Sequence, residues 1–287
     1  MLNISQYKHI HCIGIGGIGL SAVAEIFASR GYTVSGSDMK MSEMTEHLQS
    51  RGITVYEGHS AENIKGADLI VYSAAVSLEN PEITQAQKNG IPTVTRAEAL
   101  GALMEDYPSS IAVSGTHGKT TTTSMVSLIL ENAKTDPTIL VGGNLHEFGG
   151  NVKIGKSDLF VTEACEYMDS FLSLRPKMEI ILNIDSDHLD YFKDIDHIVD
   201  SFDKFAKLVP ENGCIIAYEA NPFVNKVISD AGCRVVTFGF SENSDYCAAN
   251  IEFNSEGHPL FDVRSKGELL GRVQLEVPGE HNISNAL

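Results

Sequence analysis

Hydrophobic positions in the first hundred residues alternate between the spacing of β-strands and that of α-helices. Short apolar runs predict strands at His9–Ile13, Tyr32–Ser35, Ile53–Tyr56, Asp68–Tyr72 and Thr93–Val94. Apolar residues at helical spacing predict helices at Ile18–Ser29, Met41–Ser50 and Thr95–Met104. Strands that alternate with helices through short turns are typical of a parallel sheet with helices on both faces. The pattern therefore predicts an α/β fold for this part of the chain.

A polar stretch from Glu105 to Ser110 interrupts this alternation, so we expect two domains, 1–107 and 108–287. Predicted strands in the second domain are Ile111–Ser114, Leu159–Thr162, Glu179–Asn183, Cys214–Ala217 and Arg234–Phe238. Its predicted helices are 119–131, 195–208 and Pro222–Ser229. From Ala248 to Val277 the pattern becomes β-rich, with predicted turns at Gly257, Gly267 and Gly271. We expect these segments to form hairpins at the edge of the second sheet.

Composition narrows the function classes. The 287 residues carry 21 Lys and Arg against 38 Asp and Glu, a formal charge of −17, and 43% of them are hydrophobic. A globular protein with this excess of acid is poorly suited to bind nucleic acid, and no apolar run is long enough to cross a membrane. Five cysteines without a C-x-x-C pair are typical of a reduced, cytoplasmic chain. The sequence leaves the oligomeric state open.

The first glycine-rich loop follows the first predicted strand. Residues 14–19 read G-I-G-G-I-G, and Asp38 stands at the end of the second strand. In this strand–loop–helix context, Gly14 allows a tight turn, Gly16 lets backbone N–H groups approach a pyrophosphate, and Gly19 allows the helix to pack closely. The helix N-terminus adds a partial positive charge. We therefore predict a Rossmann-like domain that binds either a dinucleotide or another nucleoside diphosphate.

A second loop, S-G-T-H-G-K-T-T at residues 114–121, also follows a strand and precedes a helix. In phosphate-binding loops the glycine backbone donates hydrogen bonds to phosphate, a lysine reaches the β- and γ-phosphates, and the next hydroxyl binds Mg²⁺. Those roles fall here to Gly115, Gly118, Lys119 and Thr120. Val113 stands where the strict Walker pattern has glycine. We therefore predict a variant P-loop in a central α/β ATPase domain.

Acidic residues follow two further strands of this domain. Glu163 and Glu166 come at the end of the strand Leu159–Thr162, and His188 lies within an aspartate-rich segment, Asp185–Asp190. The carboxyl ends of parallel strands meet at the edge where α/β proteins bind ligands. Glu163 could complete the shell of a Mg²⁺ ion held by Thr120. We therefore predict a cation site beside the second loop.

Taken in order, these segments resemble the Mur ligase family of cytoplasmic peptidoglycan synthesis, and within it the alanine-adding branch. The matching stretches are GIGGIGLSAVAEI (14–26), VSGSD (34–38), SGTHGKTTTT (114–123), EACEYMDSFL (163–172), NIDSDHLDYF (183–192) and GEHNISNAL (279–287). The resemblance implies an ATP-dependent, ADP-forming ligase that joins L-alanine to the carboxylate of UDP-N-acetylmuramate through an acyl phosphate. ATP and Mg²⁺ would be its cofactors.

The resemblance also implies roles for individual residues. Catalytic residues would be Lys119, Glu163 and His188, and the metal ligands would be Thr120, Glu163 and His188. ATP would contact Gly115, Thr116, His117, Gly118, Lys119, Thr120, Thr121, His281, Asn282 and Asn285. The UDP-sugar would contact Gly14, Gly16, Gly17, Gly19, Asp38, His59 and Ser73.

Family members continue into a third domain, so we expect this chain to be truncated and inactive alone. Three alternatives stay open. One is a ligase that attaches recycled murein peptides to the same sugar nucleotide, and another is an NAD(P)-dependent dehydrogenase, suggested by the first loop and Asp38. The third is a non-catalytic module that senses a UDP-sugar.

Overall fold

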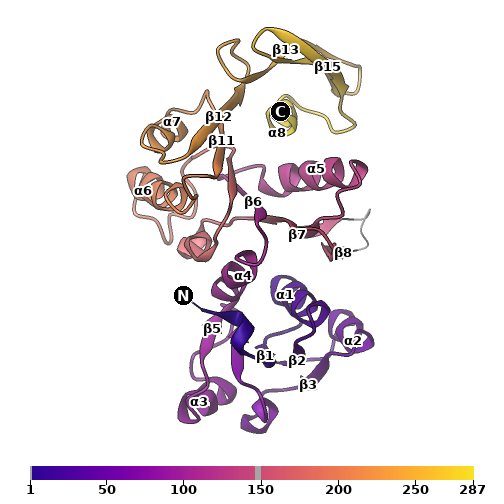
Figure 1. Cartoon of the computed structure of the whole chain (residues 1–287), viewed down its shortest axis with the longest axis vertical. Coiled ribbons are helices and arrows are strands. Elements are labelled where there is room, and N and C mark those ends of the chain that lie inside the picture. The colour runs from indigo at the N-terminus through magenta and orange to yellow at the C-terminus, as the bar shows by residue number, and fades with distance from the viewer. Residues whose placement is uncertain (1, 146–149) are drawn as a thin grey trace. The chain divides into compact units, whose positions relative to one another are not determined.

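The computed structural model describes residues 2–145 and 150–287 of the chain. Two compact units are present: one comprises Met1–Asp106 with Gly142–Ile154, and the other comprises Tyr107–Val141 with Gly155–Leu287. The first unit is indigo to magenta in Figure 1, and the second runs from magenta to yellow. Each has its own sheet, and each is an α/β structure, as the sequence pattern predicts.

A five-stranded sheet in the order β3-β2-β1-β4-β5 forms the centre of the first unit, and all its pairs are parallel. Its strands are β1 (His9–Ile13), β2 (Thr33–Asp38), β3 (Thr54–Glu57), β4 (Leu69–Tyr72) and β5 (Thr93–Thr95). Its helices are η1 (Ile4–Gln6), α1 (Ile18–Ser29), α2 (Glu43–Ser50), η2 (Ala61–Ile64), α3 (Pro81–Lys88) and α4 (Arg96–Met104). Helix α1 packs against α2 and α4, whereas α3 packs against η2.

Local sequence signals set the helix ends in this unit. Ser42 and Thr45 form a capping box at the start of α2, and Thr95 and Glu98 form another at the start of α4. Asn80 caps α3, whose first residue is a proline. These side chains satisfy backbone N–H groups that a helix start leaves without partners. The loops between the capped helices and the strands are therefore short and defined.

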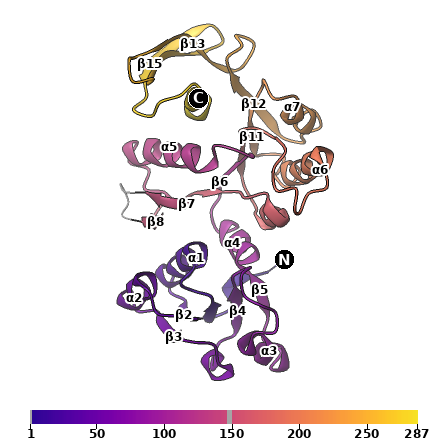
Figure 2. The same cartoon turned by 180° about the vertical axis from the view of Figure 1, so that it is seen from behind.

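The other sheet, in the order β15-β14-β13-β12-β11-β10-β6-β9-β7-β8, is formed mainly by the second unit; β8 and the end of β7 fall within 142–154. Its strands are β6 (Ser109–Ser114), β7 (Thr138–Leu145), β8 (Gly150–Lys153), β9 (Leu159–Glu163), β10 (Met178–Ile181), β11 (Cys214–Tyr218), β12 (Arg234–Gly239), β13 (Tyr246–Phe253), β14 (Pro259–Ser265) and β15 (Glu268–Gln274). The helices are α5 (Lys119–Asn132), η4 (Tyr167–Ser173), α6 (Ile195–Ala206), α7 (Pro222–Ile228) and α8 (His281–Ala286). Figure 2 shows the same elements from behind.

Buried apolar side chains hold the second unit together in two clusters. One lies between the sheet and α5 and contains Ile111, Val113, Val161, Ile180, Leu182 and Phe238. The other joins Ala248 and Phe261 of the hairpin strands to Ile283 of α8. Leu287 packs against both clusters. The apolar residues of the short helix α8 therefore anchor it to the second unit, and this anchoring fixes the positions of its polar residues.

The strand order explains how the predicted site residues come together. Strands β10, β6 and β9 are neighbours, all parallel, and their carboxyl ends lead into the segments that carry His188, Lys119 and Glu166. In the first unit, β1, β2, β3 and β4 lead into the residues that line its pocket. Both candidate sites thus lie at carboxyl ends of parallel strands, as α/β folds favour.

The structure shifts the ends of several predicted elements, such as β10, predicted at Glu179–Asn183 and observed at Met178–Ile181, and it differs more clearly in two places. Strands β7 and β8 were not predicted, because Gly142-Gly143 and Gly149-Gly150 weaken the strand signal of their sequences. The turn predicted at Gly271 is wrong: this residue pairs with Val263 within β15, next to a register shift in the β14–β15 pair. Gly257 and Gly267 do lie between the strands, with positive φ.

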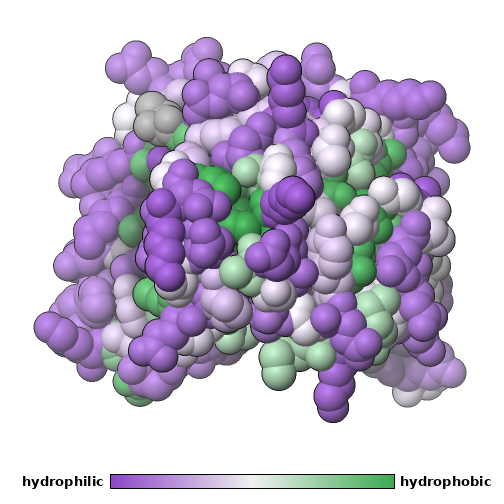
Figure 3. All heavy atoms as spheres, turned by 90° about the horizontal axis from the view of Figure 1, so that it is seen from below, coloured by the Kyte–Doolittle hydropathy of each residue, from purple (hydrophilic) through white to green (hydrophobic). Residues whose placement is uncertain are grey.

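The surface in Figure 3 is mostly hydrophilic, with hydrophobic residues visible in hollows between polar side chains. In the part of the chain that the structure describes, no helix combines the length and the apolar character that spanning a membrane requires. All five cysteines are free thiols; Cys12 and Cys247 are buried, whereas Cys165 is exposed.

Candidate functional site

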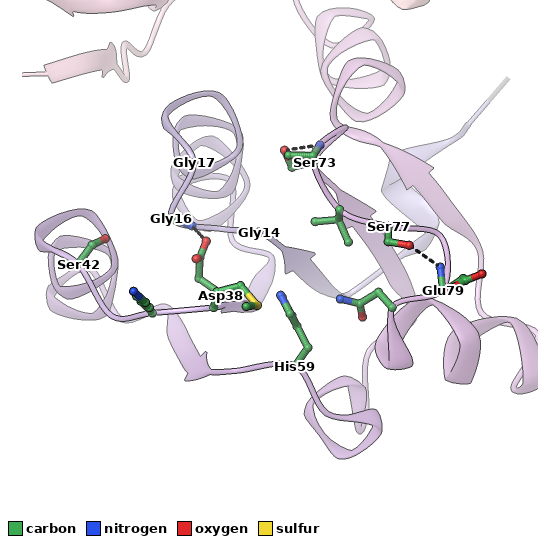
Figure 4. A pocket seen from close by; sticks show the side chains of 14 residues that line it. Gly14, Gly16, Gly17, Asp38, Ser42, His59, Ser73, Ser77 and Glu79 are labelled. Atoms are coloured by element: carbon green, nitrogen blue, oxygen red, sulfur yellow. Dashed lines mark hydrogen bonds between the residues drawn. The ribbon is translucent and has the colours of Figure 1, made fainter.

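The first glycine loop forms one wall of a pocket of about 740 Å³ in the first unit (Figure 4). Gly14 has a φ of +80°, which only glycine adopts readily, and Gly17 is the N-cap of α1. The opposite wall comes from the segment after β4, which includes Ser73, and the His59 side chain points into the pocket. The loop thus presents the N-terminus of α1 to a space large enough for a nucleotide.

Asp38 lies directly against this loop. Its Oδ2 accepts a hydrogen bond of 2.8 Å from the backbone N–H of Gly16, and a Cβ on Gly16 would come within 2.9 Å of the same oxygen. Gly16 must therefore be glycine because of Asp38 as well as any ligand. Gly19 does not line the pocket; a Cβ there would meet the Arg96 side chain at 3.2 Å. Its role in this structure is close packing.

The second loop also requires its glycines. Gly115 has a φ of +133°, and a Cβ there would lie 3.0 Å from Leu182. Gly118, at φ +88°, precedes α5, and a Cβ would lie 2.6 Å from Asn285 Oδ1. The backbone therefore approaches its neighbours more closely than any other residue type permits. This is the form of a loop that cradles an anion at a helix N-terminus.

The loop is held in place from the next strand. Asn183 accepts a hydrogen bond of 2.8 Å from the His117 N–H and donates one of 2.9 Å to the His117 carbonyl. Thr116 is buried and donates its hydroxyl to Asp185 O. His117 is exposed and Thr121 half-buried. The residues after β10 therefore fix the conformation of the loop after β6.

Lys119 extends back across the loop. Its Nζ donates to Gly115 O at 2.6 Å and to Thr116 O at 3.1 Å, and it forms an ion pair of 2.9 Å with Glu166 Oε2. The Glu166 side chain is 2% exposed and that of Lys119 is 15% exposed. Glu166 thus compensates the lysine charge within a largely dry site.

Glu166 also faces His188, whose Nε2 lies 3.8 Å from Glu166 Oε1. The structure therefore brings Lys119 and His188 to one carboxylate, to which the sequence analysis assigns no role. The signal that could have found it is the position of Glu166, three residues after Glu163 and just beyond β9. Glu163 itself accepts a hydrogen bond of 3.1 Å from the Thr120 hydroxyl.

Two tyrosine–aspartate hydrogen bonds link the segment that carries Glu166 to the segment that carries His188. Tyr167 donates its hydroxyl to Asp190 at 2.9 Å, and Tyr191 donates to Asp169 at 2.7 Å. The hydrogen bond to Asp190 raises the pKa of Tyr167, and the one to Asp169 raises the pKa of Tyr191. We call these two pairs the cross-brace.

The cross-brace holds unusual backbone. Met168, Asp169 and His188 have φ of +54°, +56° and +52°, although none of them is glycine. Left-handed backbone at non-glycine residues is strained and persists where the surrounding structure fixes it. The three strained residues lie in the two braced segments, beside Glu166.

Helix α8 contributes polar side chains near the loop. Asn285 lies next to Gly118 and donates a hydrogen bond of 3.0 Å to Asn282 Oδ1. Asn282, which is buried, donates in turn to Pro278 O. His281 is exposed, and its ring lies against Gly279. The structure therefore brings Asn285 to the second loop and uses Asn282 to orient it.

The donor set around the second loop fits a triphosphate and a hard cation. Gly118 precedes the N-terminus of α5, a position that favours an anion, and Thr120 and Glu163 offer the oxygen ligands that Mg²⁺ prefers. Within 2–145 and 150–287, no three His, Cys, Asp or Glu side chains are grouped to hold a metal by themselves. A metal at this site would therefore depend on the threonine hydroxyl and on ligand oxygens.

One Rossmann-like and one P-loop-like glycine loop, each at the carboxyl end of a parallel strand in its own α/β unit, are typical of nucleotide-dependent enzymes, and the family comparison agrees. Residues 9–108 match "Mur ligase family, catalytic domain" and residues 113–287 match "Mur ligase middle domain", so the chain belongs to the Mur ligase family.

Individual relatives narrow the comparison. The chain is 52% identical over 288 residues to UDP-N-acetylmuramate–L-alanine ligase of Acetivibrio thermocellus, covering 100% of this chain and 61% of the relative. It is 53% identical over 282 residues to the protein of the same name from Alkaliphilus metalliredigens, covering 98% and 61%. The chain thus spans about three fifths of the length of these relatives.

Solved structures of two ligases have the same fold. One is UDP-N-acetylmuramate:L-alanyl-γ-D-glutamyl-meso-diaminopimelate ligase of Neisseria meningitidis, with a TM-score of 0.86 and 32% identity, covering 98% of this chain and 91% of that chain. The other is UDP-N-acetylmuramate-alanine ligase of Thermotoga maritima, with a TM-score of 0.80 and 31% identity, covering 97% and 63%. The predicted family and fold are confirmed.

Proposed function

We propose that this chain is the sugar-nucleotide-binding and ATP-binding part of a cytoplasmic ligase that joins L-alanine to UDP-N-acetylmuramate in peptidoglycan synthesis. The observation that carries the proposal is identity above 50%, along nearly the whole chain, with two proteins named for that reaction. The γ-phosphoryl group of ATP would pass to the lactyl carboxylate, and the amine of L-alanine would then displace phosphate from the acyl phosphate. ADP and phosphate would be the other products.

Within this proposal, the pocket of the first unit holds the UDP-sugar. Gly14, Gly16 and Gly17 line the pocket at the N-terminus of α1, whose partial positive charge would face the pyrophosphate, and Lys40 is a cation in the pocket lining. Asp38, His59 and Ser73 line the same pocket and are proposed to contact the uridine. Such focused positive groups are needed because the chain carries a net charge of −17.

The second loop is proposed to hold ATP. Gly115, Thr116, His117, Gly118 and Thr121 would surround the phosphates, Lys119 would bind the β- and γ-phosphates, and Thr120 and Glu163 would hold Mg²⁺. His188 would bind or support a second metal ion, and His281, Asn282 and Asn285 would contact the base. Bound magnesium supplies charge neutralisation to the transferring phosphoryl group. Catalysis would then come from positioning and electrostatics, with no protein nucleophile.

The proposal is tested in two stages. Calorimetry on the 287-residue chain should detect binding of UDP-N-acetylmuramate and, in the presence of Mg²⁺, binding of ATP. Turnover is measured in a protein of the relatives' length that carries these residues, as ADP release with a panel of amino acids. It should depend on L-alanine. Lys119→Ala should abolish turnover and leave UDP-sugar binding intact, whereas Lys156→Ala, at an exposed lysine, should change neither.

Other outcomes would point elsewhere. Turnover with the tripeptide L-alanyl-γ-D-glutamyl-meso-diaminopimelate and not with L-alanine would favour the peptide-ligase alternative, which the Neisseria structure supports by fold at lower sequence identity. Tight NADH binding without UDP-sugar binding would favour the dehydrogenase alternative. Loss of both ligands in Lys119→Ala would mean that the nucleotide site is misplaced.

A further inference from the structure

A buried carboxylate, which no sequence motif indicates, lies behind the pocket of the first unit. Glu82, on the first turn of α3, is fully buried. Its Oε2 accepts a hydrogen bond of 2.6 Å from the Ser37 hydroxyl and lies 3.1 Å from His59 Nδ1. Its Oε1 accepts a hydrogen bond of 2.6 Å from Asn63 Nδ2. Of these partners, His59 lines the pocket. Glu82 therefore connects the protein interior to the pocket through one imidazole.

Glu82 is ionised in this environment. Burial alone would raise the pKa of its carboxyl, but the neighbouring His11, Ser37 and Asn63 side chains outweigh burial and lower it to about 2. The position on the first turn of α3 also favours a negative charge. His11 Nε2, 3.7 Å from Glu82 Oε1, is a further neighbour from β1. An ionised carboxylate only accepts hydrogen bonds.

This fixes where the proton of His59 lies. The single proton of the Ser37 hydroxyl goes to Glu82 Oε2, and Ser37 Oγ lies 3.0 Å from His59 Nδ1. Both neighbours of Nδ1 are thus acceptors, so Nδ1 must carry a proton. A neutral imidazole has only one N–H, which leaves Nε2 as a hydrogen-bond acceptor.

We propose that Glu82 is a positioning residue that holds His59 in the Nδ1-protonated tautomer, so that His59 offers an accepting Nε2 to an N–H or O–H group of the ligand. Asn63 completes the arrangement, because its Nδ2 also donates to Gly58 O and so ties the segment before His59 to Glu82. The inference deepens the proposed function: a uridine nucleotide carries such donors in its uracil imide and its ribose hydroxyls.

The tautomer can be measured without any ligand. In the chain labelled with ¹⁵N-histidine at pH 8, NMR should show a protonated Nδ1 and an unprotonated Nε2 for His59, assigned by the signal missing in His59→Gln. In Glu82→Gln, Asn63 should keep the amide oxygen at the position of Oε1 and turn the amide nitrogen toward His59. The proton should then move to Nε2. Glu62→Gln, an exposed carboxylate on η2, should leave the wild-type pattern unchanged.

A protonated Nε2 in the wild-type chain would overturn the proposal, and this measurement does not depend on whether the variant folds. An unchanged tautomer in a folded Glu82→Gln chain would also overturn it.

Ligand binding gives a second readout. UDP affinity at pH 8 should fall about tenfold in Glu82→Gln and in His59→Ala, the value of one hydrogen bond, and the double variant should lose no more. Pyrophosphate lacks the uracil imide and the ribose hydroxyls, so its affinity should not change. Equal losses for UDP and pyrophosphate would overturn the positioning role. If the wild-type chain binds no UDP, the proposed function fails while the NMR result still decides the tautomer.

Discussion

The hydroxyl of Ser114, the first residue of the second loop, lies 3.0 Å from Glu179 Oε1 and 2.9 Å from Ile180 O. Glu179 is fully buried in β10, and among the described residues nothing hydrogen-bonds its other carboxyl oxygen. Burial raises the pKa of Glu179 to about 8, and the contact with Ser114 only partly opposes this. A protonated Glu179 accounts for both contacts of the Ser114 hydroxyl. The carboxyl group then donates a hydrogen bond to Ser114 Oγ, and the Ser114 hydroxyl donates its own to Ile180 O.

This carboxyl makes stability depend on pH. Its folded-state pKa of about 8 is above the ordinary value of 4.5, so its contribution is fully present below pH 4.5 and is lost as the pH rises toward 8. Each pH unit in that window costs about 1.4 kcal/mol, or roughly 3 kcal/mol by pH 7. Glu179→Gln should therefore raise the melting temperature at pH 8 and have little effect at pH 4.5.

Thermal unfolding across this pH range checks the prediction, with Glu268→Gln, at an exposed carboxylate of β15, as the control. A change of equal size at both ends of the range would show that Glu179 is not protonated in the folded chain.

Gly118 and Gly31 have the same φ of +88° but different surroundings. A Cβ on Gly118 would meet Asn285 Oδ1 at 2.6 Å, whereas a Cβ on Gly31 has open space. Gly31→Ala should cost about 1 kcal/mol from backbone strain alone. Gly118→Ala should cost more and weaken ATP binding, because α8 must move. Urea unfolding compares the two, and adding Asn285→Ala should remove only the excess. Equal costs would contradict the close contact.

Glu166 should be essential to the stability of the second loop. Glu166→Gln leaves the Lys119 charge in a largely buried site with two carbonyls, which should cost about 3 kcal/mol of unfolding free energy. The double variant with Lys119→Met should recover much of the loss, because no unpaired charge remains. Glu211→Gln, at an exposed carboxylate, is the matched control in urea unfolding. A double variant less stable than Glu166→Gln would contradict this account.

The cross-brace should hold the segment after β9. The N–H groups of Asp169 and Phe171 donate to Glu166 O and Cys165 O, and these bonds report on its opening. Replacing Tyr167 and Tyr191 together by phenylalanine should speed amide exchange in this segment about fivefold or more, since two anchoring hydrogen bonds are lost. Tyr246→Phe, at an exposed tyrosine, is the control. Unchanged exchange would mean that packing alone fixes the segment.

The sequence pattern predicts most strands and helices because the spacing of hydrophobic residues is a local property. Hydrophobic residues recur about every second residue in a strand and about every 3.6 residues in a helix. It could not show contacts that depend on strand order. Glu166 meets Lys119 only because β9 lies beside β6, and His59 meets Glu82 only across the first sheet's loops. The sequence places Glu179 within an apolar strand, but its complete burial follows from coverage of both faces of the second sheet.

The predicted role of Asp38 shows a further limit. Its place nineteen residues beyond Gly19 favoured contact with a ligand, yet its carboxylate is already bonded to the Gly16 N–H. Spacing along the chain identifies a residue at the pocket but does not reveal the partner it has there.

Strand β15 is the last of the ten and pairs only with β14 among the described residues. Six of its seven residues are exposed, and Leu269 and Leu270 are more than half exposed. An edge strand with free backbone groups and apolar side chains is a template for pairing with another chain. The 287-residue polypeptide should therefore self-associate as its concentration rises. Substituting charged residues along this edge should keep it monomeric.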